Sequence, residues 1–227
     1  MPRMGQMTRL QAAAGDTDTY LAAATPAPGA PVLLLHSWWG LNEDMRDLAD
    51  RLAGDGFTVM APDLFDGKVL TTIEDAEAFT TAIERGGGLG GLNPDRIQGR
   101  VEATLDHLLA HPEVRGDRAA IVALSFGGWY GSSVASERSD VAAFVSIYSD
   151  VYEGPGGAAY LGHFAEDDQF VESPEAAGAK PLSAGSAAHV YPGMKHWFTE
   201  PDRPEYDEEA AELVYSRTVA FLRENLT

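Results

Sequence analysis

The sequence predicts an α/β fold in which a mostly parallel sheet carries helices on both faces. Short apolar runs, which indicate buried strands, alternate along the chain with stretches whose apolar residues recur at helical spacing. This alternation is typical of β-α-β units, which place successive strands in parallel. No internal repeat or change in composition marks a boundary, and 227 residues suit one domain with a full core. We therefore expect a single domain over residues 1–227.

The strands expected in the first half of the chain differ in how apolar they are. Residues 31–36 and 57–61 are continuous apolar runs, as in strands that are buried on both faces. Residues 17–25 alternate less regularly and suit an edge strand. Residues 1–11 suggest only a loose start to the chain.

Three helices are expected in the same half. Asn42 suits the N-cap of the first, whose apolar residues recur at helical spacing up to Gly54. Residues 72–85 and 94–110 suit two more helices. The glycine-rich residues 86–91 between them lack the Lys-Ser/Thr pair of a phosphate-binding loop and follow a helix rather than a strand. We therefore expect a flexible connector there.

The second half of the chain repeats the alternation. The expected strands are residues 119–124, 141–148, 158–164 and 187–191. The expected helices are residues 129–137, a short segment at 173–179 and a terminal helix at 207–225. In parallel sheets of this kind, the chemistry lies at the carboxyl ends of the strands, so the residues that follow each strand are the candidates for a site.

Composition narrows the possible partners and locations. The formal net charge of −19 argues against nucleic acid and against an anionic membrane surface, since both are polyanions. The absence of cysteine excludes disulfides, cysteine metal sites and a cysteine nucleophile. Residues 1–15 lack the apolar run of a signal peptide, and no stretch approaches the ~20 apolar residues that span a bilayer. We expect a cytoplasmic protein.

Residues 121–128 predict a strand that stops abruptly at a serine. Four apolar residues run into Ser125, and two glycines follow within three residues. A serine on so sharp a turn exposes its hydroxyl above the sheet, and the turn requires small neighbours. The pattern is close to G-x-S-x-G, with Ala123 at the first small position. Ser125 is therefore a candidate nucleophile.

A serine hydroxyl needs a base, and the base needs a third group that fixes its tautomer. On such a sheet the expected order along the chain is serine, then acid, then histidine, each at a strand end. His196 follows a Pro-Gly turn after the last strand and is the candidate base. His189 lies inside that strand and suits a structural role.

The candidate acid is Asp168. It follows an expected strand, and the apolar residues 170–171 after it can pack its loop against the core. Asp150 and Asp167 also follow strands and stay open as alternatives. The position of an acid between the serine and the histidine completes the residue set that nucleophilic catalysis by serine needs.

The remaining candidates surround the strand ends. The backbone N–H of Phe126, directly after the serine, and that of Trp38, in the loop after residues 31–36, are candidate donors to an oxyanion. Trp39, Trp129 and Trp197 are candidates for the wall of a substrate pocket. Aromatic residues also fill protein cores, so this second role stays open for each of them. An aromatic pocket would suit a neutral acyl or aryl ester.

These stretches together resemble the dienelactone hydrolase family of α/β-hydrolases. The matching residues are 35–42, 46–53, 61–64, 125–128, 162–168 and 191–198. The resemblance implies Ser125 as nucleophile, Asp168 as acid and His196 as base. It also implies an α/β-hydrolase fold with about eight strands and no large lid.

Three positions depart from the family pattern. The namesake enzymes have a cysteine nucleophile where this chain has Ser125, and a glutamate that partners the cysteine where this chain has Ser37. They also hold the substrate carboxylate partly with an arginine at the position of Glu200. These departures, together with the net charge of −19, favour serine esterase chemistry on a small neutral substrate over hydrolysis of an anionic dienelactone.

We expect a serine hydrolase that cleaves carboxylic esters or lactones through an acyl-enzyme, with no metal or cofactor. The same three residues also cleave other acyl bonds, so a thioesterase or another acyl hydrolase stays open. A protein that binds a small ligand in the same cleft without catalysis is the alternative from another class. The sequence does not indicate the oligomeric state.

Overall fold

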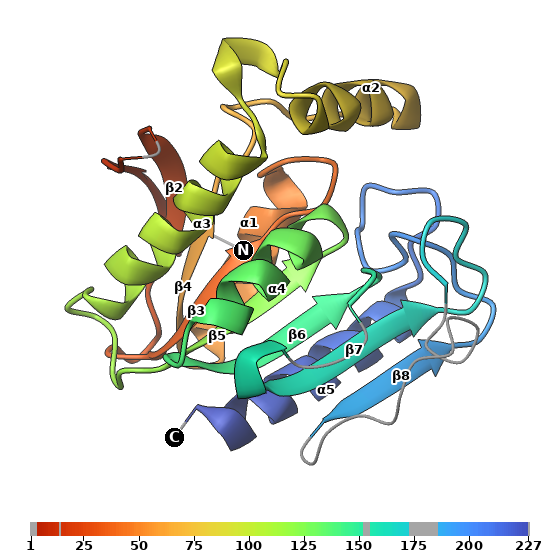
Figure 1. The fold of residues 1–227 in the computed structure, drawn as a ribbon. Helices are drawn as coiled ribbons and strands as arrows, with labels where there is room; N and C mark the ends of the chain where they lie inside the picture. Colours follow the sequence, from red (N-terminus) through yellow and green to blue (C-terminus); the bar gives the residue numbers. More distant parts are fainter. Residues whose placement is uncertain (1–3, 14, 152–154, 173–185, 227) are drawn as a thin grey trace. The chain divides into compact units, whose positions relative to one another are not determined.

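The computed structural model describes residues 4–13, 15–151, 155–172 and 186–226 (Figure 1). The chain forms two compact units, Met1–Arg115 and Gly116–Thr227. The described residues contain eight strands and five α-helices, and four of the strands lie in each unit. The short helix expected at residues 173–179 lies outside the described residues, and the single domain over residues 1–227 stays a prediction.

The first unit contains a mixed sheet. Its strands are β1 (Gln6–Leu10), β2 (Thr17–Ala22), β3 (Ala30–Leu35) and β4 (Phe57–Pro62), in the order β1-β2-β4-β3. β3 and β4 are parallel, whereas β2 is antiparallel to both of its neighbours. We expected a loose start to the chain, but residues 6–10 form β1, so that prediction is wrong there. Because β1 pairs with β2, β2 is not an edge strand. β1 is mostly exposed, so it lacks the apolar run that marks the other strands.

The three helices expected in the first unit are present. They are α1 (Glu43–Gly54), α2 (Ile73–Glu84) and α3 (Pro94–Leu109), and Asn42 caps α1 by accepting the Met45 N–H at 3.1 Å. α1 packs against β2 and β4, while α3 packs against β3 and β4 on the other face (Figure 1). The glycine-rich connector includes one 3-10 turn, η1 (Leu89–Gly91).

Buried polar contacts fix the loops that follow β3 and β4. The Nδ1 of His36 bonds the Ser37 carbonyl at 2.7 Å, and its Nε2 accepts the Leu64 N–H at 3.1 Å. Burial lowers the pKa of His36, which keeps the ring neutral and therefore able to donate at one nitrogen and accept at the other. The Leu70 N–H also donates to the Trp39 carbonyl at 3.1 Å. The two loops are thus joined at several points.

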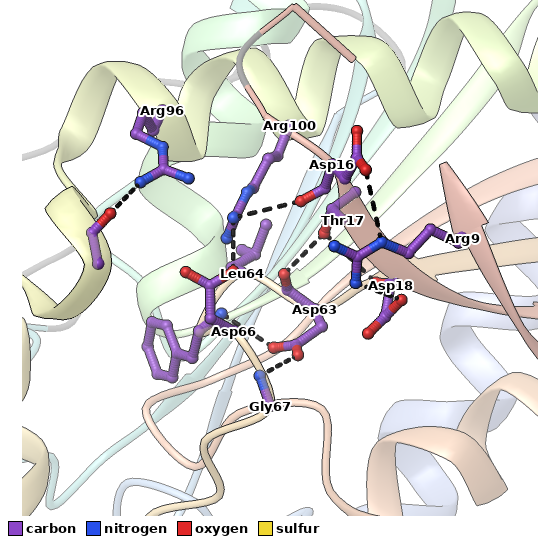
Figure 2. A network of polar contacts seen from close by, with 12 residues as sticks. Arg9, Asp16, Thr17, Asp18, Asp63, Leu64, Asp66, Gly67, Arg96 and Arg100 are labelled. Atoms are coloured by element: carbon purple, nitrogen blue, oxygen red, sulfur yellow. Dashed lines mark hydrogen bonds and ion pairs between the residues drawn. The ribbon is translucent and has the colours of Figure 1, made fainter. Parts of the chain in front are cut away.

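A buried arginine ties the loop after β4 to α3. Arg100 is 1% exposed, and its Nη2 lies 2.5 Å from an Asp66 carboxylate oxygen and 3.4 Å from the Asp16 carbonyl (Figure 2). Asp63, in the same loop, accepts the backbone N–H groups of Phe65 and Gly67. These contacts stabilise the conformation of the loop, in which the backbone of Asp66 lies in the left-handed region.

The strands of the second unit are all parallel. Its strands are β5 (Ala119–Leu124), β6 (Val141–Ile147), β7 (Ala159–Ala165) and β8 (Ala187–Tyr191), in chain order. The 3-10 turn η2 (Pro155–Gly157) precedes β7. Every residue of β5 and β6 is buried, as their apolar runs predict.

Helices cover both faces of the strands in the second unit. α4 (Phe126–Glu137) packs against β5 and β6, and α5 (Glu208–Asn225) packs against β6 and β7 on the other face (Figure 1). α4 begins directly after Ser125, three residues earlier than expected, because the turn through the serine needs no linker. The predicted α/β fold with mostly parallel strands is confirmed. Within the described part of the chain, no helix has the length and apolar character needed to cross a bilayer.

A buried histidine lies between β7, β8 and α5. His163 is fully buried, with its Nδ1 2.8 Å from the Tyr191 hydroxyl and its Nε2 3.2 Å from the Thr218 hydroxyl. His189, on β8, lies opposite it, with the two rings stacked at 5.9 Å. Burial is the main reason why the pKa of His163 falls to about 3. Protonation would also remove the ring nitrogen that accepts a hydrogen bond.

We expect His163 to make the unfolding free energy depend on pH. An unfolded histidine has a pKa of about 6.5, so below that pH the unfolded chain binds a proton that the folded chain excludes. The unfolding free energy should therefore fall with a limiting slope of about 1.4 kcal/mol per pH unit, or by about 2.3 kcal/mol between pH 6.5 and 4.5. Urea titrations of the wild type and His163→Gln measure this. The variant should lose that part of the slope, and parallel slopes would contradict the prediction.

Candidate active site

Ser125 occupies a strained turn between β5 and α4. Its backbone lies at φ 47° and ψ −112°, in a region that residues with a side chain rarely adopt. Its N–H donates to the Ile147 carbonyl at 2.9 Å, and its own carbonyl accepts the Gly128 N–H at 2.9 Å. These bonds hold the turn, so the side chain stands clear of the strand at its carboxyl end.

Gly128 lets α4 approach the loop that follows β6. A Cβ at this position would collide with the hydroxyl and the Cβ of Ser149. A larger residue would therefore push the first turn of α4 away from the sheet and move Ser125 with it. Glycine is therefore required at position 128 because the neighbouring loop is so close, and not because the backbone has an unusual φ angle there.

The structure brings Ser125, His196 and Asp168 into one line of hydrogen bonds. The Ser125 Oγ lies 2.9 Å from His196 Nε2, and His196 Nδ1 lies 2.7 Å from Asp168 Oδ2. The side chains of His196 and Asp168 are only 3% and 2% exposed. Because an ionised carboxylate can only accept, Nδ1 carries the proton and Nε2 is left to accept the serine hydroxyl.

The loop after β7 is built around the Asp168 carboxylate. Its Oδ1 accepts the backbone N–H groups of Phe170 at 2.8 Å and Val171 at 3.0 Å, while Oδ2 faces the imidazole. Asp167 and Asp150, the alternatives left open by the sequence, are exposed. The Asp167 N–H instead donates to the Met194 carbonyl at 2.9 Å, which ties this loop to the one that bears His196.

Aromatic rings enclose the imidazole of His196. The ring centroids of Tyr148, Phe170 and Trp197 lie 4.8, 5.1 and 4.8 Å from it. Tyr148 was not a candidate from the sequence, although it directly follows a fully buried strand, which is the position where site residues are expected. Both Tyr148 and Trp197 have positive φ angles, of 38° and 67°.

Glu200 is a second buried carboxylate in this unit. It is 2% exposed, and its Oε1 accepts the Tyr148 hydroxyl at 2.7 Å. Burial, and then the charge of Glu200, raise the pKa of Tyr148 well above its usual value, so the phenol remains a donor. The position that we expected to hold an arginine in the namesake enzymes therefore carries a buried negative charge here.

The remaining residues predicted for the oxyanion donors and the pocket wall differ in their burial and in the unit to which they belong. Phe126 is the first residue of α4, so its N–H lies at the positive end of the helix dipole. Trp197 is buried beside His196, whereas Trp129 is 73% exposed on α4. Trp38 and Trp39 belong to the first unit, where Trp38 is half-buried and Trp39 is buried.

The geometry in the second unit suits nucleophilic chemistry. A hydroxyl that donates to a neutral imidazole can lose its proton as it attacks, and the buried carboxylate stabilises the imidazolium that results. Among the residues that the structure describes, no group of three or more histidine, aspartate or glutamate side chains is arranged to hold a metal ion.

Known proteins are similar to this chain in sequence and in fold. The chain is 32% identical over 238 residues to the "Putative carboxymethylenebutenolidase" of Azospirillum brasilense, a match that covers 97% of this chain and all of the relative. A crystal structure described as a "Putative Dienelactone Hydrolase" from Klebsiella pneumoniae has a TM-score of 0.77 at 20% identity, covering 97% of this chain and 98% of the other. A cold-adapted esterase from an Arctic intertidal metagenomic library has a TM-score of 0.73 at 20% identity, covering 98% and 94%.

The model of one protein family matches almost the whole chain. It is the dienelactone hydrolase family, and the match runs over residues 17–226. This span includes every strand except β1, and it includes all of the residues that meet at His196. The chain therefore belongs to the dienelactone hydrolase family, a family of hydrolases in the α/β-hydrolase superfamily.

Proposed function

We propose that the chain is a serine hydrolase that cleaves carboxylic ester or lactone bonds of a small neutral substrate through an acyl-enzyme. The observation that carries this proposal is the line of hydrogen bonds from Ser125 through His196 to Asp168. A nucleophile, a base and a group that orients the base are the parts that acyl transfer requires. Membership of a hydrolase family supports the same class of reaction.

In the proposed reaction, Ser125 Oγ attacks the carbonyl carbon while His196 Nε2 takes the hydroxyl proton. Asp168 stabilises the imidazolium without taking its proton. The backbone N–H of Phe126 is a proposed donor to the oxyanion, and the helix start at this residue supports it. The N–H of Trp38, in the first unit, stays a prediction from the sequence.

Collapse of the tetrahedral intermediate breaks the ester bond, and the imidazolium gives its proton to the leaving alkoxide. His196 then removes a proton from a water molecule that attacks the acyl-enzyme. The acid departs, and the proton held by His196 returns to Ser125. No step needs a metal or a redox cofactor.

Charge supports a neutral substrate. The net charge of −19 repels anions, and Glu200 places a buried carboxylate in the same unit as the proposed base. Relatives named as carboxymethylenebutenolidases and a structural neighbour described as an esterase support lactones and esters as the classes to test. Trp197, beside the imidazole, is the pocket candidate with the strongest support, while Trp39 and Trp129 stay predictions. A cytoplasmic location also stays a prediction.

The direct test is hydrolysis of a panel of neutral aryl esters, neutral lactones, acyl thioesters and dienelactone. We expect measurable kcat/KM on the neutral esters or lactones, and a loss of about 10⁴-fold or more in Ser125→Ala, because the nucleophile is removed. Circular dichroism checks that the variant is folded. Equal activity of the folded Ser125→Ala variant and the wild type would exclude this mechanism, and activity on thioesters alone would change the substrate class.

We expect Glu200 to reduce activity on carboxylate-bearing substrates. In Glu200→Arg, the ratio of kcat/KM for an anionic ester to that for a neutral ester of the same length should rise about tenfold, since opposite charges at close range contribute about 1.4 kcal/mol or more near a protein surface. Glu200→Gln, which removes the charge but keeps a similar shape, should give a smaller rise. An unchanged ratio in both folded variants would place the substrate's charged group away from Glu200.

A further inference from the structure

Tyr148 is held in an unfavourable backbone conformation at the end of β6. Its φ angle of 38° lies in the left-handed region, which is unfavourable for a bulky residue. Its N–H donates to the His163 carbonyl at 2.7 Å, and its side chain is fully buried. Surrounding contacts must therefore stabilise this conformation.

The phenol of Tyr148 has polar partners on a single loop. It donates to Glu200 Oε1 at 2.7 Å, and the Thr199 hydroxyl lies 2.8 Å from the phenol oxygen of Tyr148. Because the single phenol proton goes to Glu200, the Thr199 hydroxyl is the donor in the second bond. This loop also bears His196, so the bonds from Thr199 and Glu200 connect the end of β6 to the segment that carries the proposed base.

The aromatic ring of Tyr148 contacts the imidazole itself. The two ring centroids are 4.8 Å apart, with the planes tilted by 55°. The bond from Nδ1 to Asp168 fixes the tautomer of His196, whereas packing against its neighbours limits how far the ring plane can rotate about that bond. A base that is rotated away from Ser125 cannot take its proton efficiently.

We propose that Tyr148 and Glu200 form a positioning pair for His196, in which Glu200 fixes the Tyr148 phenol and the Tyr148 ring holds the imidazole toward Ser125. The proposal rests on the proposed serine hydrolase function. It gives a role to the buried carboxylate of Glu200, which takes no part in the proposed reaction. Neither residue is proposed to touch the reacting atoms.

The charge of Glu200 should also affect the protonation of His196. In the described part of the second unit, Asp168 from the loop after β7 and Tyr148 from the end of β6 contact His196, and Glu200 is bonded to Tyr148. Arg203, which follows on that loop, pairs with Asp202. A nearby carboxylate favours the imidazolium, so neutralising Glu200 should shift the acidic limb of the kcat/KM profile to lower pH.

The test compares four single variants on a small neutral ester. Tyr148→Phe keeps the ring but loses the phenol bond, and Glu200→Leu loses the acceptor. Each should lower kcat about tenfold with KM within about twofold of the wild type, because the base is misplaced but substrate binding is not changed. Glu200→Gln keeps an acceptor, so it should retain most of kcat while the acidic limb moves to lower pH. Tyr160→Phe removes the hydroxyl of another fully buried tyrosine, in β7, and should leave kcat unchanged.

Two further measurements separate this pair from general loss of structure. The double variant Tyr148→Phe/Glu200→Leu should be no slower than either single variant, since each change breaks the same bond. Urea unfolding checks each variant, and if Tyr148→Phe does not fold, the comparison of Glu200→Gln with Glu200→Leu gives the same answer. Wild-type kcat and pH profiles in folded Tyr148→Phe and Glu200→Leu would overturn the proposal.

The outcome is distinguishable from failure of the proposed function. If no ester in the panel is turned over, the rate at which a fluorophosphonate modifies Ser125 replaces kcat, since that reaction also needs His196 as base. In that case slower modification of Ser125 in Tyr148→Phe and Glu200→Leu than in the wild type supports the positioning pair, and equal modification rates in all variants overturn it. Loss of all modification at Ser125 in the folded wild type would instead contradict the serine hydrolase assignment, and the pair with it.

Discussion

The buried hydrogen bond between His196 and Asp168 is the constraint on which the site depends. A carboxylate with 2% of its side chain exposed is stable only where hydrogen bonds replace the lost water. The N–H groups of Phe170 and Val171 and the ring of His196 supply those bonds. The loops after β7 and β8 must therefore keep fixed shapes, and the parallel strands bring both loops to the edge of the sheet where β5 ends at Ser125.

Backbone strain is concentrated at the same edge of the second unit. Of the described residues other than glycine that have a positive φ angle, Ser125, Tyr148 and Trp197 lie in direct contact with His196. Strain of this kind persists only where many contacts determine one conformation. The buried ring contacts and the Tyr148–Glu200 bond supply those contacts. The strained backbone thus accompanies a fixed arrangement of Ser125, His196 and Asp168.

Local chemistry explains which parts of this arrangement could be predicted from the sequence. β5 and β8 begin and end with their apolar runs, and Asn42 caps α1, because these features depend on neighbouring residues alone. β1 was missed because a mostly exposed strand has no apolar run. Tyr148 was missed because its partner Glu200 lies 52 positions away, and the exposure of Trp129 depends on which side of α4 faces the sheet.

The central claim is that Ser125 carries the acyl group during turnover. Mixing the protein with 4-nitrophenyl acetate, quenching with acid within the first turnover and mapping the peptides by mass spectrometry tests this claim most directly. We expect an acetyl group on the Ser125 side chain in the wild type. The Ser125→Ala variant should carry no acetyl group on the corresponding peptide. Hydrolysis of the ester with no acetyl group on Ser125 at any time would contradict the account.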